Sequence, residues 1–138
     1  MSFLVDTNIF SEIRKGAEAS VQVRRWWSSV DVDGIYVSVI VLGEIRRGIE
    51  RIRRRDLSQA VVLERWLEQM ATTYAERVLD VDARVADVWG RLQVPNPLSS
   101  IDSLLAATAI VHDLVLVTRN IKDVQATGVR YLNPFEAA

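Results

Sequence analysis

The residues best suited to chemistry in this sequence are carboxylates, and Asp6 is the first of them. It directly follows the apolar run Phe3–Val5 and is itself followed by Thr7 and Asn8. A short apolar run bounded by polar residues fits a strand that is buried on both faces. Parallel α/β sheets bind ligands just outside the carboxyl ends of their strands, so we expect Asp6 to lie at a ligand site.

Three other carboxylates are placed where they would reach the same sheet edge, namely Glu44, Asp102 and Asp123. For each of them an ordinary structural role remains open. Glu44 lies on the flank of an apolar helix stripe, where it would pair with a neighbouring arginine. Asp102 completes a capping-box pattern that starts at Ser99. Asp123 follows the strand expected at 114–117 closely enough to cap the next helix.

A cluster of these four acids would need a cation. Two unit charges about 4 Å apart repel by about 4 kcal/mol at an effective dielectric constant of 20, which is large beside a domain stability of about 5–15 kcal/mol. Oxygen ligands without Cys or a nearby His favour Mg²⁺ or Mn²⁺ over Zn²⁺. Such ions act on phosphate esters and need no protein nucleophile. This agrees with a chain that offers no catalytic Ser, Cys or His arrangement.

The composition is that of an ordinary globular protein. The chain has 138 residues, of which 49% are hydrophobic, and it contains no cysteine. This length suits one domain, which we place at residues 1–138. No signal peptide is recognisable, and the longest apolar-rich run, Ile35–Leu42, is far shorter than the roughly 20 residues of a membrane span. We therefore expect a soluble cytoplasmic protein that makes no membrane contact.

The distribution of charge is more informative than the net charge of −1. Six arginines fall between Arg46 and Arg55, opposed there only by Glu50. One interpretation is a solvated helix end, which is what charge runs usually are. The other is a surface that binds phosphates or an acidic partner, for which the guanidinium group is well suited.

Apolar runs alternate with segments of helical periodicity along the whole chain. We expect strands at 3–5, 35–39, 78–79, 114–117 and 130–132. Thr7 or Asn8 is expected to cap the first helix, with Gly16 as its stop, and a second helix is expected over 17–30. This alternation predicts an α/β fold, with a parallel or mostly parallel sheet covered on both faces.

Four sequence features together resemble one known family. They are Leu4-Val5-Asp6-Thr7-Asn8, Glu44 in the helix after Ser38, Asp102 at a helix start, and Thr118-Arg119-Asn120 followed by Asp123. In this combination and order the chain resembles the PIN-domain nucleases over essentially its whole length. The similarity is greatest to the VapC or FitB-type toxins of bacterial toxin–antitoxin pairs. One position departs from the pattern, because Val124 stands where many family members have Phe.

The resemblance implies a three-layer α/β/α sandwich and a Mg²⁺- or Mn²⁺-dependent endoribonuclease that leaves 5′-phosphate and 3′-hydroxyl ends. It implies Asp6, Glu44, Asp102 and Asp123 as the acidic quartet, and it leaves open whether Asp123 ligates the metal directly or through water. The supporting polar residues would be Thr7, Asn8, Thr118 and Asn120. Candidate phosphate contacts are Arg46, Arg47 and Arg119. It further implies a homodimer, inhibition by an antitoxin, and operator DNA bound only through that antitoxin.

Other interpretations of the acids fit less well. A phospho-acceptor domain needs adjacent acids after the first strand and a Lys after the last core strand, whereas Arg119 and Asn120 stand in that second place. A haloacid-dehalogenase-type phosphatase needs a second Asp where Asn8 stands. The remaining alternative is a non-catalytic PIN-like interaction module, whose acidic pocket docks a basic partner peptide.

Overall fold

A computed structural model, which describes residues 1–136, shows a five-stranded sheet in the order β3-β2-β1-β4-β5. The strands are β1 Phe3–Val5, β2 Ile35–Ser38, β3 Val78–Leu79, β4 Val115–Val117 and β5 Tyr131–Leu132. All four pairings are parallel, and Leu4 in the centre pairs with Tyr36 and Leu116. The carboxyl ends of the strands therefore meet at one edge of the sheet.

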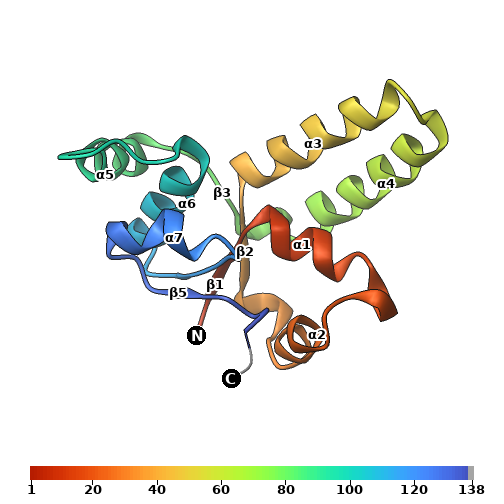
Figure 1. Cartoon of the computed structure of the whole chain (residues 1–138), viewed down its shortest axis with the longest axis horizontal. Coiled ribbons are helices and arrows are strands. Elements are labelled where there is room, and N and C mark those ends of the chain that lie inside the picture. The colour runs from red at the N-terminus through yellow and green to blue at the C-terminus, as the bar shows by residue number, and fades with distance from the viewer. Residues whose placement is uncertain (137–138) are drawn as a thin grey trace.

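Helices cover both faces of this sheet, which gives the predicted three-layer α/β/α arrangement (Figure 1). On one side lie α1 Thr7–Ile13, α2 Val21–Ser28, α3 Val39–Arg53 and α4 Leu57–Thr73. On the other side lie α5 Ala83–Leu92, α6 Ser100–Val111 and α7 Ile121–Val124. Helices α3 and α4 pack against each other as a hairpin that extends outward from the sheet (Figure 1).

The core is built around β1 and β4, whose residues are buried throughout. Helix α6 lies close over these strands because its inner face is small, with Ala106, Ala107 and Ala109 fully buried. On the other face, Trp26 of α2 packs edge-on against Phe3, with ring centroids 5.3 Å apart. None of the helices described in residues 1–136 combines the length and the apolar character that crossing a bilayer requires.

The helix boundaries differ from the sequence predictions at the start of the chain. The cap of α1 is Asp6 rather than Thr7 or Asn8, because the Thr7 backbone N–H donates to Asp6 Oδ1 at 2.7 Å. Helix α1 ends at Ile13, and Gly16 opens a separate 3₁₀ turn with a positive φ of 63°. The second helix begins only after Ser20, whose side chain caps it, so the expected helix over 17–30 is too long.

Side-chain caps also start two of the later helices. Ser38 Oγ accepts from the Ile40 N–H at 3.0 Å and starts α3, and Asp82 Oδ1 accepts from the Val85 N–H at 2.9 Å and starts α5. These side chains satisfy backbone donors that the first turn of a helix leaves free. The Ser38 cap matters most for function, because it fixes where α3 leaves the carboxyl edge of the sheet.

Candidate active site

Asp6 lies at the carboxyl end of the central strand and is only 4% exposed. Its backbone N–H continues the sheet by donating to the Val117 carbonyl at 2.9 Å. One carboxylate oxygen caps α1, and the other accepts from the buried Thr118 hydroxyl at 2.7 Å. The Thr118 hydroxyl is itself oriented, because it also accepts from the Asn120 N–H at 3.0 Å. The Asp6 side chain is thus held in one orientation by the start of α1 and by the residue that follows β4.

Glu44 reaches the same region from α3. Its Oε1 accepts a hydrogen bond from the Thr7 hydroxyl at 2.7 Å, although the two residues are 37 positions apart in the chain. The alternative that Glu44 pairs with a neighbouring arginine does not hold, because no ion pair of Glu44 occurs among residues 1–136. Glu44 is half-buried and free to interact with a ligand through its second oxygen.

Asp102 lies in the first turn of α6 and faces Asn120 across the site. Burial raises its pKa, hydrogen bonding from Asn120 lowers it, and the nearby charge of Asp123 raises it. The capping-box interpretation of this segment is not confirmed, because the Ser99 side chain makes no capping hydrogen bond. Ser99 and Ile101 instead line the cavity into which Asp102 projects.

A cavity of about 410 Å³ brings three of the four predicted acids together. Its lining residues are Asp6, Thr7, Asn8, Glu44, Ser99, Ile101, Asp102 and Asn120. Asp123 is not among them: it is exposed on the short helix α7 and acts on the site through the pKa of Asp102. A larger cavity, of about 790 Å³, lies elsewhere, between α2 and the segment after β5, and none of these acids lines it.

The surroundings of Asp6 disfavour its charged form. Burial is the largest cause, and it raises the pKa of Asp6 from 3.8 to about 6. Hydrogen bonds from Thr118 and Thr7 oppose this rise, while the charges of Asp102 and Glu44 add to it. The site therefore concentrates negative charge where the protein offers no compensating group, as ligand-binding and catalytic sites often do.

Comparison with known proteins identifies the fold family. A family model described as the PIN domain matches residues 3–126 of the chain. The chain belongs to the PIN-domain family. Among curated proteins, VapC ribonuclease Y4jK of Sinorhizobium fredii is 28% identical and the match covers 98% of this chain and 99% of that protein. Toxin FitB of Neisseria gonorrhoeae is 27% identical, with 96% and 97% covered.

Solved structures agree with this assignment. The crystal structure of FitAcB from Neisseria gonorrhoeae superposes with a TM-score of 0.89 at 28% identity, covering 98% of this chain and 99% of that one. A structure of FitAB bound to a DNA fragment also gives 0.89, at 26% identity, with 99% and 97% covered. The resemblance expected from the motifs at Asp6, Glu44, Asp102 and Thr118–Asn120 is confirmed for the family.

The cavity of this PIN domain suits a hard divalent cation by its donor chemistry. It offers carboxylate, hydroxyl and amide oxygens, no Lys or Arg lines it, and the chain has no Cys. No ion pair within residues 1–136 involves Asp6, Glu44, Asp102 or Asp123. Over the same residues, however, no three acidic or histidine side chains stand close enough to form a complete ligand cluster. An ion would thus have to draw these side chains inward, which the half-buried Glu44 and Asp102 allow.

The three arginines predicted to contact phosphate have different surroundings in the PIN domain. Arg46 is held by Glu64 of α4 at 2.6 Å and by Glu50 at 3.3 Å, on the side of α3 that faces α4. Arg119 stacks its guanidinium over the Phe135 ring at 4.3 Å. Arg47 is exposed and has no ion-pair partner in the described part of the chain.

The sequence did not reveal the side chains that hold the Asp102 segment in place. The Ser103 hydroxyl accepts from the Trp89 indole N–H at 3.0 Å and from the Gln93 amide at 3.2 Å. The side-chain Oε1 of Gln93 accepts from the Leu98 N–H at 2.8 Å, across the loop that carries two prolines. The one available signal was a polar Ser103 on an otherwise apolar helix face, which needs a buried hydrogen-bond partner.

Proposed function

We propose that this PIN domain is a divalent-metal-dependent endoribonuclease that acts as the toxin of a toxin–antitoxin pair. The observation that carries the proposal is the convergence of Asp6, Glu44 and Asp102 on one cavity without a basic partner among the described residues. They come from three separate elements, so their meeting is a property of the fold rather than of local sequence. The ribonuclease and toxin names of the relatives support the same activity.

Each acid has a distinct part in the proposed site. Asp6 is the fixed ligand, because Thr118 and the Thr7 backbone hold its two oxygens. Asp102 approaches from α6, and Glu44 is aimed by the Thr7 hydroxyl. Asp123 acts at longer range and lowers the local potential at Asp102. An Mg²⁺ or Mn²⁺ ion, when bound, would supply Lewis-acid activation of water and neutralisation of the phosphate.

The substrate and partners are part of the same proposal. The substrate is an RNA phosphodiester, with exposed arginines near the cavity contacting neighbouring phosphates. The antitoxin is a protein whose basic residue enters the acidic cavity and competes with the metal, and operator DNA is bound through that antitoxin. We also propose a homodimer that works in the cytoplasm. The solved structure of FitAB bound to a DNA fragment, at 26% identity, supports the proposed complex with a partner protein and DNA.

The cleavage assay that tests the proposal uses structured RNA, with and without Mg²⁺ or Mn²⁺. We expect the wild-type chain to cut RNA only with metal, and Asp6→Asn to lose at least about a hundredfold in rate, because a charged ligand is removed. The matched control is Asp80→Asn, which changes an exposed Asp that also follows a strand, β3, but does not line the cavity. Its rate should equal that of the wild type.

Equal, EDTA-resistant cleavage by the wild type and by Asp6→Asn would overturn the proposal. Titration with Mn²⁺ in a calorimeter separates the alternative of an interaction-only module. That module needs no metal, so it would show neither binding heat nor cleavage, while a basic peptide would still dock in the cavity.

A further inference from the structure

The arginines of α3 and its C-cap residue Arg54 fall into two groups with different surroundings. Arg46 and Arg53 lie on the flank facing α4, where Glu64 accepts from both, at 2.6 Å and 3.1 Å. Glu50 pairs with the same two arginines from within α3. The charges of Arg46 and Arg53 are therefore already paired, and these ion pairs help to hold α3 against α4.

The other flank of α3 carries a row of arginines without such partners. Arg47, Arg51 and Arg54, which we call the arginine stripe, follow Glu44 at steps of three, four and three residues. Residues three and four apart lie on one side of a helix. All three are exposed, and none forms an ion pair or a side-chain hydrogen bond with another described residue. The stripe therefore begins one turn beyond an acid that lines the cavity.

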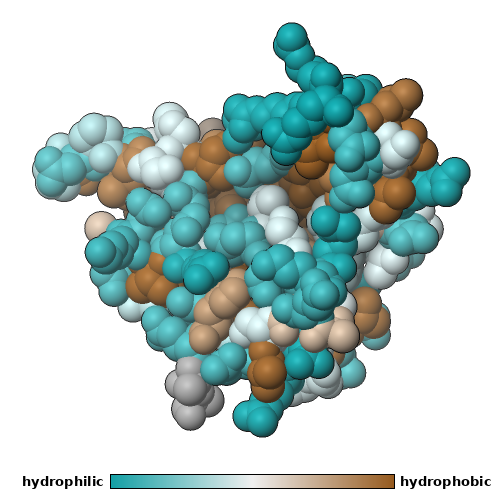
Figure 2. Space-filling view, turned by 45° about the vertical axis from the view of Figure 1, so that its right-hand side comes forward, coloured by the Kyte–Doolittle hydropathy of each residue, from teal (hydrophilic) through white to brown (hydrophobic). Residues whose placement is uncertain are grey.

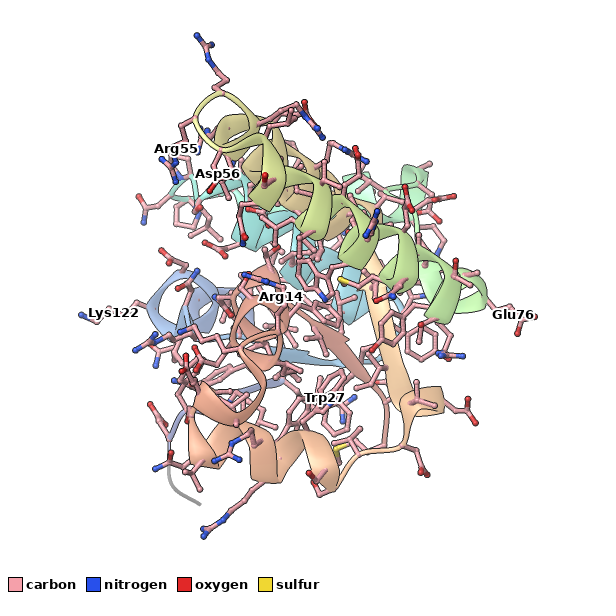
Figure 3. All side chains as sticks on the ribbon, turned by 90° about the vertical axis from the view of Figure 1, so that its right-hand side faces the viewer. Arg14, Trp27, Arg55, Asp56, Glu76 and Lys122 are labelled. Carbon is pink, nitrogen blue, oxygen red and sulfur yellow. The ribbon has the colours of Figure 1, made fainter. Side chains whose placement is uncertain are left out.

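The outer end of the hairpin carries hydrophilic side chains. Figure 2 shows a strongly hydrophilic group at the top of the molecule, with hydrophobic patches beside it. Figure 3 places Arg55 and Asp56 at that outer end, in the turn between α3 and α4. At 1.5 Å per residue, the helix axis from Glu44 to Arg54 measures about 15 Å. Phosphates on a stacked nucleic-acid strand follow one another about every 3.4 Å along the axis, so this length matches about four nucleotides.

We propose that the arginine stripe binds the phosphates of single-stranded RNA that flank the bond to be cut, and so guides the strand into the acidic cavity. The inference rests on the proposed ribonuclease function and adds where the substrate lies. The physical need is clear, because a cavity lined by Asp6, Glu44 and Asp102 repels a polyanion. Unpaired guanidinium groups beside it supply the attraction, and bidentate contacts orient the strand.

The test measures RNA binding apart from cleavage, in the Asp6→Asn background with EDTA present. The probe is a short fluorescein-labelled single-stranded RNA of mixed sequence, followed by anisotropy over a range of KCl concentrations. Changing Arg47→Gln together with Arg51→Gln should weaken binding about tenfold at low salt. It should also reduce the slope of log affinity against log salt by about 1.4, since each phosphate contact on a single strand contributes about 0.7.

The matched control is Arg24→Gln with Arg25→Gln, which removes the same charge from α2 at the opposite end of the sheet (Figure 1). Its affinity and salt slope should stay close to the parent values, and circular dichroism should show both pairs folded. Equal losses in the two pairs, or none in the stripe pair, would overturn the inference. If wild-type cleavage persists with metal in that case, the proposed function stands without it.

A second experiment distinguishes RNA from an acidic protein segment as the ligand of the arginine stripe. If Arg47→Gln with Arg51→Gln loses binding to the cognate antitoxin but binds RNA as the parent does, the stripe binds the partner protein and the RNA inference is overturned. A parent protein that binds no RNA at all would overturn it as well, and the cleavage assay then shows whether the proposed function fails too.

Discussion

At the scale of single residues, Asp6 combines two requirements that oppose each other. Its capping of α1 and its bond from Thr118 need an acceptor at this position. Its burial beside Asp102 and Glu44 makes the negative charge costly and raises the pKa of Asp6 to about 6. A carboxylate retained at a place where a neutral acceptor would be more stable is a sign of function.

This conflict predicts that Asp6→Asn stabilises the metal-free protein. A folded-state pKa of about 6 against 3.8 means that the native state binds the proton more tightly, so stability falls as pH rises from about 4 to 6. The full penalty at pH 7.5 is at most about 3 kcal/mol. We expect Asp6→Asn to gain about 1–3 kcal/mol at pH 7.5 in EDTA and almost nothing at pH 4, measured by urea denaturation. A gain that grows as the pH is lowered would contradict this account.

At the scale of elements, α6 reaches the site only because α5 and the proline-containing loop hold its first turn. The side-chain amide of Gln93 accepts from the Leu98 N–H through its oxygen and donates to the Ser103 hydroxyl through its nitrogen. Ser103 is the residue next to Asp102. A side chain that bonds both ends of a loop fixes that loop more firmly than backbone contacts alone. Gln93 is therefore a positioning residue for Asp102.

Replacing Gln93→Leu should loosen the start of α6. The Leu98 N–H and the Ser103 hydroxyl would each lose a partner, which costs about 1–3 kcal/mol in unfolding free energy. Beyond that loss, Mn²⁺ affinity should fall severalfold, and the Leu98 amide should exchange with solvent faster. The control is Gln69→Leu, at an exposed position on α4 that makes no side-chain hydrogen bond with the described residues. Reduced stability with unchanged Mn²⁺ affinity would show that Gln93 has only a structural role.

Features that depend on neighbouring residues could be predicted from the sequence, whereas contacts between separate helices could not. The apolar runs at β1 and β4 are local signals, and the strands predicted there are confirmed. The pairing of Arg46 with Glu64 joins residues 18 positions apart on two helices, and no periodicity within one helix reveals it. The place of α7 was equally hidden, since four residues carry too little pattern to show that Asp123 does not line the cavity.

At the scale of the whole molecule, the wholly parallel sheet explains why residues as distant as Asp6 and Asp102 share a cavity. Every strand ends at one edge, so the segments that follow β1, β2 and β4 meet there. Helix α6 precedes β4 and starts at the same edge, which brings Asp102 of its first turn to the cavity. The fold thus gathers acids whose mutual repulsion weakens it. A bound cation reverses that repulsion, and any ligand that binds only the folded state stabilises the whole domain.

Metal binding in the cavity should therefore be measurable as an increase in the unfolding free energy of the whole domain. At a Mn²⁺ concentration of a hundred times Kd, we expect about 2.7 kcal/mol of added stability and a rise in Tm of roughly 10 °C. The rise should shrink as the pH falls below about 6, because protonated Asp6 cannot ligate a metal. Scanning calorimetry checks this with Asp80→Asn as the control that keeps the full shift, while Asp6→Asn should lose nearly all of it. If Mn²⁺ raised the Tm of both variants equally, the metal would bind outside the cavity, and the acids would not share an ion.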